Sequence, residues 1–289
     1  MDGGSRILNL NNRGVIKIID DALKEDIRTG DITTDSVIGN KEMEVEGVVT
    51  AKENGVIAGL EIAELVFQRL NKNIDFNILS VDGRRVEKGT PISRVKGDCS
   101  SILKGERLAL NFLQRLSGIA TKTAEYKKLV EDLDVDIVDT RKTTPNLRVL
   151  EKYAVRTGGG KNHRFGLYDA VMIKDNHIKA VGSISAAVQK AKQNTAHTVK
   201  IEVETSTLDE VKEAIDVQVD IIMLDNMSIE QMKKAVEMVN DKAVSIILEA
   251  SGGITRKNLR EVAETGVDVI SLGTLTHTID SLDIGLDLL

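Results

Sequence analysis

The stretch VKIEVETSTLDEVKEAIDVQVDIIMLDN, residues 199–226, decides the fold. It begins with the apolar run 199–204 and ends with the apolar run 221–226, and between them TLDEVKEAID carries its apolar residues at helical spacing. A buried strand, an amphipathic helix and a second buried strand make up the unit from which parallel sheets are built. The stretch therefore predicts a βαβ unit whose two strands run in the same direction.

The same alternation extends on both sides of this unit. Further apolar runs are DIVDT (136–140), AVMIKD (170–175), SIILEAS (245–251) and VISLG (269–273), and helical patterns at 183–193, 228–239 and 255–265 separate most of them. Six strands fall short of the eight in a complete barrel, and no GxGxxG fingerprint follows the first of them. We therefore predict an α/β fold with an incomplete, seven-stranded barrel rather than an open dinucleotide-binding sheet.

The chain before this region has a different texture. Its pattern predicts a helix at 15–26, a polar loop at 25–38, short strands within 44–59 and 80–98, and a long helix within 101–133. On that long helix Leu108, Phe112 and Leu116 share one face, and Arg107 lies on the opposite one. We expect a β-rich first domain over 1–115, the barrel domain over 116–274, and a tail, 275–289, that packs with the first domain.

Composition limits the classes of function. The 289 residues include 39 Lys and Arg against 45 Asp and Glu, a net charge of −6, which argues against a protein that binds nucleic acid through bulk positive charge. Cys99 is the single cysteine, so an internal disulfide and a cysteine-based zinc cluster are excluded. The sequence has neither a membrane-length apolar run nor the apolar core of a signal peptide at its start. We expect a cytoplasmic protein without a nucleic-acid or membrane partner.

Polar residues gather where the predicted barrel strands end, which is the edge that carries the active site in barrels of this kind. The residue types there are cations, acids and a small-residue turn, namely Arg141, Lys142, Lys174, Glu204, Asp225, Glu249, Ala250, Ser251, Gly252, Gly253 and Gly273. Such cations suit an anionic substrate, and backbone N–H groups of small residues on the last strands suit a phosphate. The two acids suit Mg²⁺ held partly by substrate phosphates.

Each of these features also has an ordinary explanation. An Arg-Lys pair is commonly a solvated surface, and a lone acid at a strand end is often the N-cap of the next helix. The pair Gly252-Gly253 is compatible with a simple turn. Their shared position at one edge of the sheet carries the prediction.

Longer blocks of the sequence identify a family. EDIRTGDITT, GERLALNFLQRLSGIAT, DTRKTTPNLRVLEKYAVRTGGGKNHRFGLYDAVMIKDNH, IEVE, MLDN, EASGGI and VISLG follow in order from residue 25 to 273. The chain resembles the quinolinate phosphoribosyltransferases over nearly its whole length. The resemblance implies an open-faced β-sandwich domain joined to a seven-stranded α/β barrel. It also implies a homodimer with active sites at the subunit interface, and it leaves open whether dimers assemble further.

The reaction that the resemblance implies converts quinolinate and phosphoribosyl pyrophosphate into nicotinate mononucleotide, pyrophosphate and CO₂, as part of NAD biosynthesis. It implies Mg²⁺, which enters with phosphoribosyl pyrophosphate, and no organic cofactor. Matching the family motifs residue by residue places Arg107, Arg141, His163, Arg164 and Lys174 around the quinolinate carboxylates.

The same matching assigns the phosphate-binding and catalytic groups. Lys142 and Lys174 would neutralise the departing pyrophosphate, while Glu204 and Asp225 would hold Mg²⁺ and the ribose hydroxyls. The residues for the 5-phosphate would be Ser251, Gly252, Gly253 and Gly273. The resemblance also implies that Arg107 serves the active site of the neighbouring subunit.

Two other functions remain possible on these residues. A related phosphoribosyltransferase of the same fold would act on another pyridine or pyrimidine, but the presence of Arg107, Arg141, His163 and Arg164 favours quinolinate. A non-catalytic sensor of sugar phosphates would not need both lysines and both acids, so their joint presence favours an enzyme.

Overall fold

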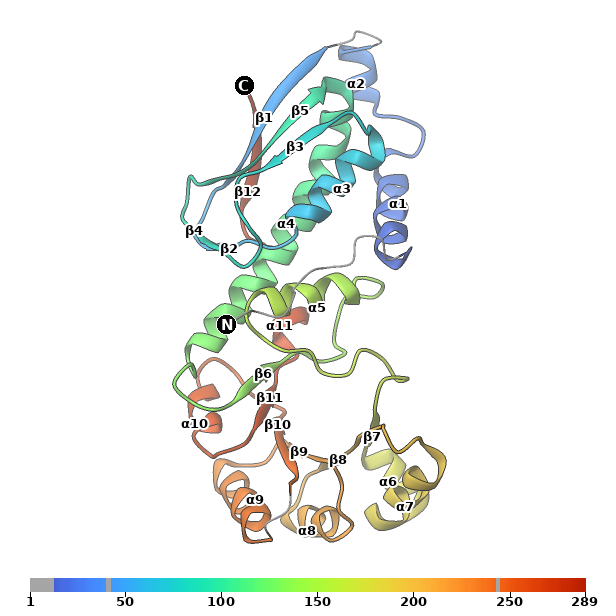
Figure 1. Cartoon of the computed structure of the whole chain (residues 1–289), viewed down its shortest axis with the longest axis vertical. Coiled ribbons are helices and arrows are strands. Elements are labelled where there is room, and N and C mark those ends of the chain that lie inside the picture. Colours follow the sequence, from blue (N-terminus) through green and yellow to red (C-terminus); the bar gives the residue numbers. More distant parts are fainter. Residues whose placement is uncertain (1–12, 40–42, 243–244) are drawn as a thin grey trace. The chain divides into compact units, whose positions relative to one another are not determined.

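The computed structural model describes residues 13–39, 43–242 and 245–289. It divides into two compact units, which are treated separately below (Figure 1). The first comprises the described residues of Met1–Ala124 with Thr143–Gly159 and Leu275–Leu289, and the second comprises Glu125–Lys142 and Gly160–Thr274. Among the described residues, no helix has both the length and the apolar composition needed to cross a bilayer.

The second unit is built on a parallel sheet, and each of the six predicted apolar runs forms one of its strands. The sheet order is β6-β11-β10-β9-β8-β7. The bounds are β6 (Asp136–Val138), β7 (Val171–Ile173), β8 (Ile201–Thr205), β9 (Ile221–Asp225), β10 (Ile247–Ser251) and β11 (Val269–Ser271). All neighbouring pairs are parallel, with Glu204 opposite Met223 and Ser251 opposite Asp225. The α/β class predicted from the alternation of strands and helices is confirmed.

The seventh position of the predicted barrel is only a single bridge. Beyond the edge strand β6, Val138 forms an isolated parallel bridge with Lys161. Lys161 follows three glycines, Gly158–Gly160, whose high backbone entropy and missing side chains disfavour a longer strand. In the described part of the chain this sheet therefore has six strands and one bridge.

Helices follow the strands and lie along the outer side of the sheet (Figure 1). They are α6 (Asp175–Val181), α7 (Ile184–Asn194), α8 (Leu208–Asp216), α9 (Ile229–Asp241) and α10 (Leu259–Ala263). Both α8 and α9 begin with a capping box, formed by Thr207 with Glu210 and by Ser228 with Gln231. These caps fix where each helix starts, and hence the length of the loop that follows the preceding strand.

The first unit contains an antiparallel sheet with the strand order β12-β1-β5-β3, and a short pair β2-β4. The strand bounds are β1 (Glu44–Ala51), β2 (Gly55–Val56), β3 (Asp75–Ile78), β4 (Arg85–Val86), β5 (Pro91–Asp98) and β12 (Ile284–Leu288). The tail reaches this sheet because β12 pairs with β1, with Gly47 opposite Leu288. The helices are α1 (Arg13–Ile27), α2 (Ile32–Val37), α3 (Leu60–Leu70), α5 (Arg148–Thr157), and most of α4 (Cys99–Lys128) and α11 (Thr274–His277), whose residues 125–128 and 274 belong to the second unit.

The prediction of a polar loop at 25–38 is wrong, because the second half of this stretch forms the helix α2. Asp31 caps this helix: its Oδ1 accepts the N–H groups of Thr33 at 3.0 Å and Thr34 at 3.1 Å. Hydrogen bonds from Thr34 also lower the pKa of Asp31. The cap satisfies the helix start locally, so a six-residue helix forms in a stretch that is otherwise polar and β-branched.

Candidate active site

The alternation of side chains along the parallel strands places the candidate residues in two layers. On β8, Glu202 and Glu204 point to the same side, as do Glu249 and Ser251 on β10, because side chains two residues apart share a face. In both pairs the first residue is buried and the second is half-buried. The strand ends therefore form an accessible mouth, and residues two positions earlier form its floor.

A cavity of about 250 Å³ opens at this mouth. It is lined by residues of the second unit only, from the ends of the strands and the segments that follow them. Those predicted from sequence are Arg141, Lys142, His163, Arg164, Lys174, Glu204, Asp225 and Ser251, and the others are Thr140, Met172, Met223 and Ser271. The structure thus brings most of the candidate residues to one cavity.

The remaining candidates lie elsewhere in the chain or only beside the lining. Gly252 and Gly253 follow Ser251 directly and both have positive φ, 85° and 61°. Gly273 comes two residues after the end of β11. Arg107 belongs to the first unit, on α4, where it is exposed while Leu108, Phe112 and Leu116 are buried as predicted.

Charge in the cavity is dominated by cations. Arg141, Lys142, Arg164 and Lys174 face only two lining carboxylates, those of Glu204 and Asp225. The ammonium group of Lys174 forms an ion pair with Glu204, whose side chain is 16% exposed. Burial and, next, the positive charge of Arg141 lower the pKa of Arg164. Cations held this close to one another indicate a site for an anionic ligand, because the ligand would relieve their mutual repulsion.

The acid of β9 is bonded by its neighbour Asn226, which lies against the turn that follows β10. Asp225 Oδ2 accepts a hydrogen bond of 2.9 Å from Nδ2 of Asn226. A Cβ atom on Gly252 would lie 2.4 Å from Oδ1 and 2.5 Å from Cγ of Asn226. Glycine is therefore needed at this position for two reasons, its left-handed backbone and the closeness of the Asn226 side chain.

We expect Gly252→Ala to lower both stability and activity. The left-handed conformation alone should cost about 1–2 kcal/mol of unfolding free energy, and displacement of Asn226 should release Asp225. Gly266→Ala is the matched control, since Gly266 has φ 91° and a Cβ there would meet only Val236 at 3.4 Å. Both variants should lose stability in urea titrations, and Gly252→Ala should in addition lose turnover. Equal turnover of the two folded variants would contradict this role of the turn.

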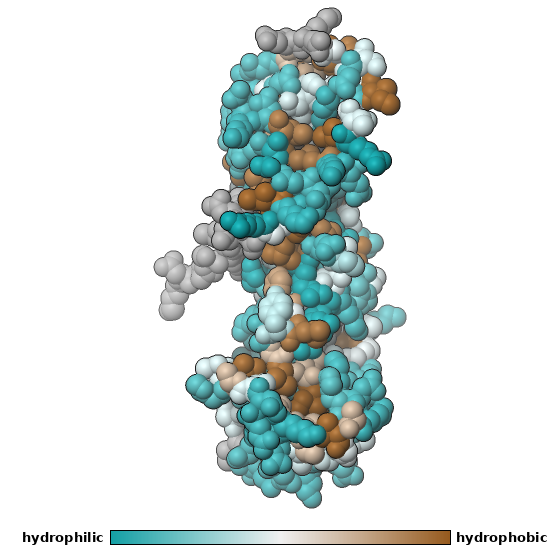
Figure 2. Space-filling view, turned by 90° about the vertical axis from the view of Figure 1, so that its right-hand side faces the viewer, coloured by the Kyte–Doolittle hydropathy of each residue, from teal (hydrophilic) through white to brown (hydrophobic). Residues whose placement is uncertain are grey.

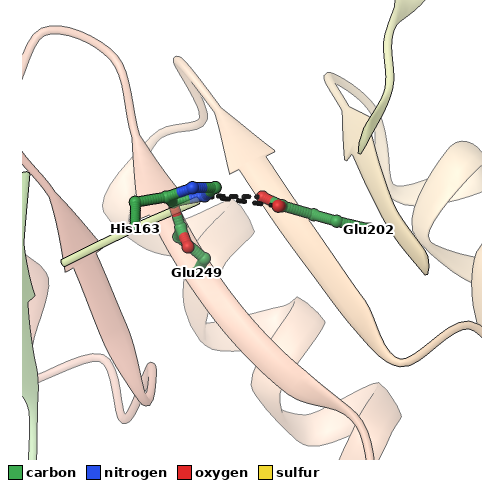
Figure 3. A group of neighbouring side chains, drawn as sticks. All are labelled: His163, Glu202 and Glu249. Atoms are coloured by element: carbon green, nitrogen blue, oxygen red, sulfur yellow. Dashed lines mark hydrogen bonds and ion pairs between the residues drawn. The ribbon is translucent and has the colours of Figure 1, made fainter. Parts of the chain in front are cut away.

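Two buried acids lie beneath the cavity: Glu202 is not predicted from the sequence, and Glu249 is predicted at the strand end but without a role. Glu202 and Glu249 lie 2% and 3% exposed in the floor layer, and together with His163 they bring ligand-type atoms within 4.8 Å of one another (Figure 3). Burial, and next the negative charge of Glu202, raise the pKa of Glu249. The signal that could have found them is a glutamate inside an otherwise apolar strand, on the same side as the acid or serine at the strand end.

Comparisons with known proteins point to one family. The model of the quinolinate phosphoribosyl transferase C-terminal domain matches residues 119–287, and that of the N-terminal domain matches residues 31–117. A Bacillus subtilis protein named "probable nicotinate-nucleotide pyrophosphorylase (carboxylating)" is 46% identical over 278 residues, which are 96% of this chain and 94% of that protein. The carboxylating nicotinate-nucleotide pyrophosphorylase of Mycobacterium leprae is 41% identical over 270 residues, 92% of this chain and 94% of the relative.

A solved structure gives the same result in three dimensions. The nicotinate-nucleotide pyrophosphorylase from Francisella tularensis superposes with a TM-score of 0.92 at 39% identity, covering 99% of this chain and 100% of that one. Two family models that together span most of the sequence, and relatives of this identity over nearly its full length, show that the chain belongs to the quinolinate phosphoribosyltransferase family.

Proposed function

We propose that this protein transfers the phosphoribosyl group of phosphoribosyl pyrophosphate to quinolinate, giving nicotinate mononucleotide, pyrophosphate and CO₂. The observation that carries the proposal is the cavity in which two guanidinium and two ammonium groups face two carboxylates. Both substrates are polyanions, so this charge arrangement fits them. Family membership supplies the substrate class, and the arginines supply the reason for a dicarboxylate, because a guanidinium fork binds a carboxylate through two parallel bonds.

The chemistry requires no protein nucleophile. The ring nitrogen of quinolinate attacks C1 of the ribose, and the C1–O bond to pyrophosphate breaks with both electrons leaving on oxygen. When the carboxylate beside the nitrogen departs as CO₂, the electron pair of the broken C–C bond stays on the ring carbon, where the adjacent positive nitrogen stabilises it, and that carbon then takes up a proton. The protein's contribution is therefore positioning and charge stabilisation.

The residues of the cavity divide this work. Arg141 and Arg164 hold the carboxylates of quinolinate, and Lys142 and Lys174 stabilise the charge that develops on pyrophosphate. Lys174 is bound to Glu204 in the structure, and its ammonium group has three donors, so it can contact a phosphate oxygen as well. The small residues at the ends of β10 and β11 bind the 5-phosphate, because their backbone N–H groups donate hydrogen bonds to its oxygens.

Glu204 and Asp225 fit Mg²⁺ only as a partial set of ligands. Both are half-buried carboxylates on neighbouring strands, but the single group of three metal-ligand side chains among the described residues is the one around His163. Two carboxylates suit a cation that keeps water and substrate phosphates as its other ligands. When bound there, Mg²⁺ would neutralise charge on the pyrophosphate oxygens.

Pyrophosphate release tests the proposal directly. The protein should release pyrophosphate when quinolinate and phosphoribosyl pyrophosphate are present together with Mg²⁺, and not when either substrate is omitted. Release that ignores quinolinate would mean simple hydrolysis and would contradict the assignment.

We further propose a homodimer in which Arg107 serves the site of the neighbouring subunit. Arg107 is exposed, and the cavity draws its lining from the other unit. Apolar side chains are also exposed, among them Ile32 and Val37 on α2 and Leu167 and Tyr168 before β7. Apolar surface is visible on the face drawn in Figure 2. Exposed apolar side chains are common at subunit interfaces.

Mixed dimers of Arg107→Ala and Lys142→Ala should recover activity that neither variant has alone. If Arg107 acts across the interface, one site of each mixed dimer combines an intact Lys142 with an intact Arg107. Each mixed dimer has one intact site of two, so mixed dimers purified through both tags should approach about half of wild-type activity, and the unfractionated mixture, of which half is mixed, about a quarter. Differentially tagged chains would be co-expressed, purified through both tags and assayed. Inactive mixed dimers would show that Arg107 serves its own chain or neither.

A further inference from the structure

The hydrogen bonds of His163 engage both nitrogens of its ring. Nδ1 accepts the backbone N–H of Arg164 at 2.6 Å. Nε2 lies 3.2 Å from Oε2 and 3.4 Å from Oε1 of Glu202, and Figure 3 shows the ring edge facing that carboxylate. Oε1 of Glu249 is more distant, 3.5 Å from Nε2. Each ring nitrogen therefore has a partner inside the protein.

These bonds specify where the ring proton resides. A nitrogen that accepts an N–H must present its lone pair, so Nδ1 carries no proton. A neutral imidazole has one donor and one acceptor, which leaves the proton on Nε2. Oε2 of Glu202, 3.2 Å away, is the nearest acceptor for that proton. Glu202 thus selects the tautomer that the Arg164 N–H requires.

The Glu202 side chain is well placed for this task. It is 2% exposed, and a buried carboxylate is costly unless a donor compensates it. It comes from β8, two residues before Glu204, so the sheet itself fixes its position. The backbone of His163 is fixed as well, since its N–H donates to Oδ1 of the fully buried Asp139 at 2.9 Å.

The next link leads into the cavity. Arg164 follows His163, and its guanidinium donates to the carbonyl of Ala170 at 2.9 Å and approaches Sδ of Met172 at 3.5 Å. An arginine has five N–H donors, and these two contacts use two of them while the side chain lines the cavity. Arg164 is therefore held at two points: its guanidinium by the carbonyl of Ala170, and its backbone N–H by the His163 ring.

We infer that Glu202 is a positioning residue for quinolinate: it holds His163 in the Nε2–H tautomer, and Nδ1 of His163 then fixes the backbone from which Arg164 reaches the substrate carboxylate. The inference rests on the proposed function. It gives His163 a task in addition to the one the family resemblance implies, because the ring also acts through Arg164.

Kinetics of three variants test the role of Glu202. Glu202→Leu removes the acceptor and should raise the KM for quinolinate at least about tenfold, equivalent to about 1.4 kcal/mol, with the KM for phosphoribosyl pyrophosphate unchanged. Glu202→Gln keeps an acceptor oxygen and should stay within about threefold of wild type. Glu237→Gln, the same change at an exposed position of α9, is the control and should match wild type. A parallel rise in both KM values would overturn the inference.

A double-mutant cycle asks whether Glu202 works through Arg164. If it does, Glu202→Leu should add little to the loss of quinolinate affinity already caused by Arg164→Lys, because coupled residues are not additive. Additive losses would mean that Glu202 acts by another route, and the inference would fall. This outcome leaves the overall reaction intact, so it is distinguishable from a failure of the proposed function.

Nitrogen NMR reads the tautomer without substrate. In protein labelled with ¹⁵N-histidine, the signals that disappear in His163→Gln, out of four histidines, belong to His163. The wild type should show the neutral Nε2–H tautomer, and Glu202→Leu should shift it toward Nδ1–H.

A wild-type imidazolium, an Nδ1–H tautomer, or a metal ion found in the purified protein and bound by His163 would each overturn the inference. Should Glu202→Leu fail to fold, the wild-type and Glu202→Gln spectra still decide. The Nε2–H tautomer in a protein that converts no quinolinate would instead refute the proposed function.

Discussion

Replacing Lys174 by alanine is expected to lower turnover by roughly 10–150-fold at saturating phosphoribosyl pyrophosphate, while the protein still folds. The variant loses charge-assisted bonds to the pyrophosphate oxygens, each worth about 1.5–3 kcal/mol. It also leaves Glu204, which is 16% exposed, without the ammonium group it now contacts. Lys142→Ala should lose turnover to a similar extent, because it removes the second ammonium group from the same cavity.

Lys179→Ala is the matched control for this experiment. Lys179 is on α6, five residues beyond Lys174, and it also forms an ion pair, with Asp175 at 2.8 Å, but its side chain is 73% exposed. Removing a surface pair of this kind should change little. Kinetics of Lys174→Ala that match those of Lys179→Ala would contradict the role given to Lys174.

Nicotinate is expected to be a very poor substrate. It has only one carboxylate, and lacks the one beside the ring nitrogen. A site built to bind a charged group rejects an analogue without it, because the donors of the site are then left unpaired, and discrimination of about 10⁴-fold in kcat/KM is typical. Here the donors would be Arg141 and Arg164, and burial together with the positive charge of Arg141 lowers the pKa of Arg164.

The measurement is a comparison of kcat/KM for the two acids under the same conditions. Phthalate, which carries both carboxylates on a ring without nitrogen, should compete with quinolinate without reacting. Comparable efficiency with nicotinate and quinolinate would favour a related phosphoribosyltransferase that acts on another pyridine.

The barrel could be predicted because its strands are buried on both sides. Such strands appear in the sequence as short continuous apolar runs, and all six formed strands where they were expected. The seventh strand is different, because it consists of a single bridge between Val138 and Lys161. The glycines before Lys161 prevent a longer strand, and no apolar run marks the bridge in the sequence. Its length depends on backbone entropy rather than on an apolar pattern.

The helices of the first unit show where sequence reasoning ends. The stretch around α2 contains mostly polar and β-branched residues, and only the hydrogen bonds of Asp31 reveal it as a helix start. The beginning of α3 is capped from a distance: Oδ2 of Asp82 accepts the N–H of Gly59 at 2.6 Å, although 23 residues separate them. A cap supplied by tertiary structure leaves no local signal in the sequence.

The site was predictable at its mouth and not at its floor. Residues at strand ends, such as Lys174 and Asp225, could be placed because all parallel strands end at the same edge. Glu202 lies inside an apolar run and is not predicted, and Glu249 is expected at a strand end but lies in the buried layer. Their contact with His163 depends on a segment without a periodic pattern, so it cannot be predicted from the sequence. Bonds between segments far apart in the sequence become visible only in the folded chain.

The fate of the two quinolinate carboxylates tests the central claim most directly. Quinolinate labelled with ¹⁴C in the carboxylate beside the nitrogen should release one labelled CO₂ for each pyrophosphate formed, and only when phosphoribosyl pyrophosphate is present. Quinolinate labelled in the other carboxylate should release none and should carry its label into the mononucleotide. Release from the second position, release without phosphoribosyl pyrophosphate, or pyrophosphate formed without CO₂ would contradict the assignment of this protein as a decarboxylating phosphoribosyltransferase.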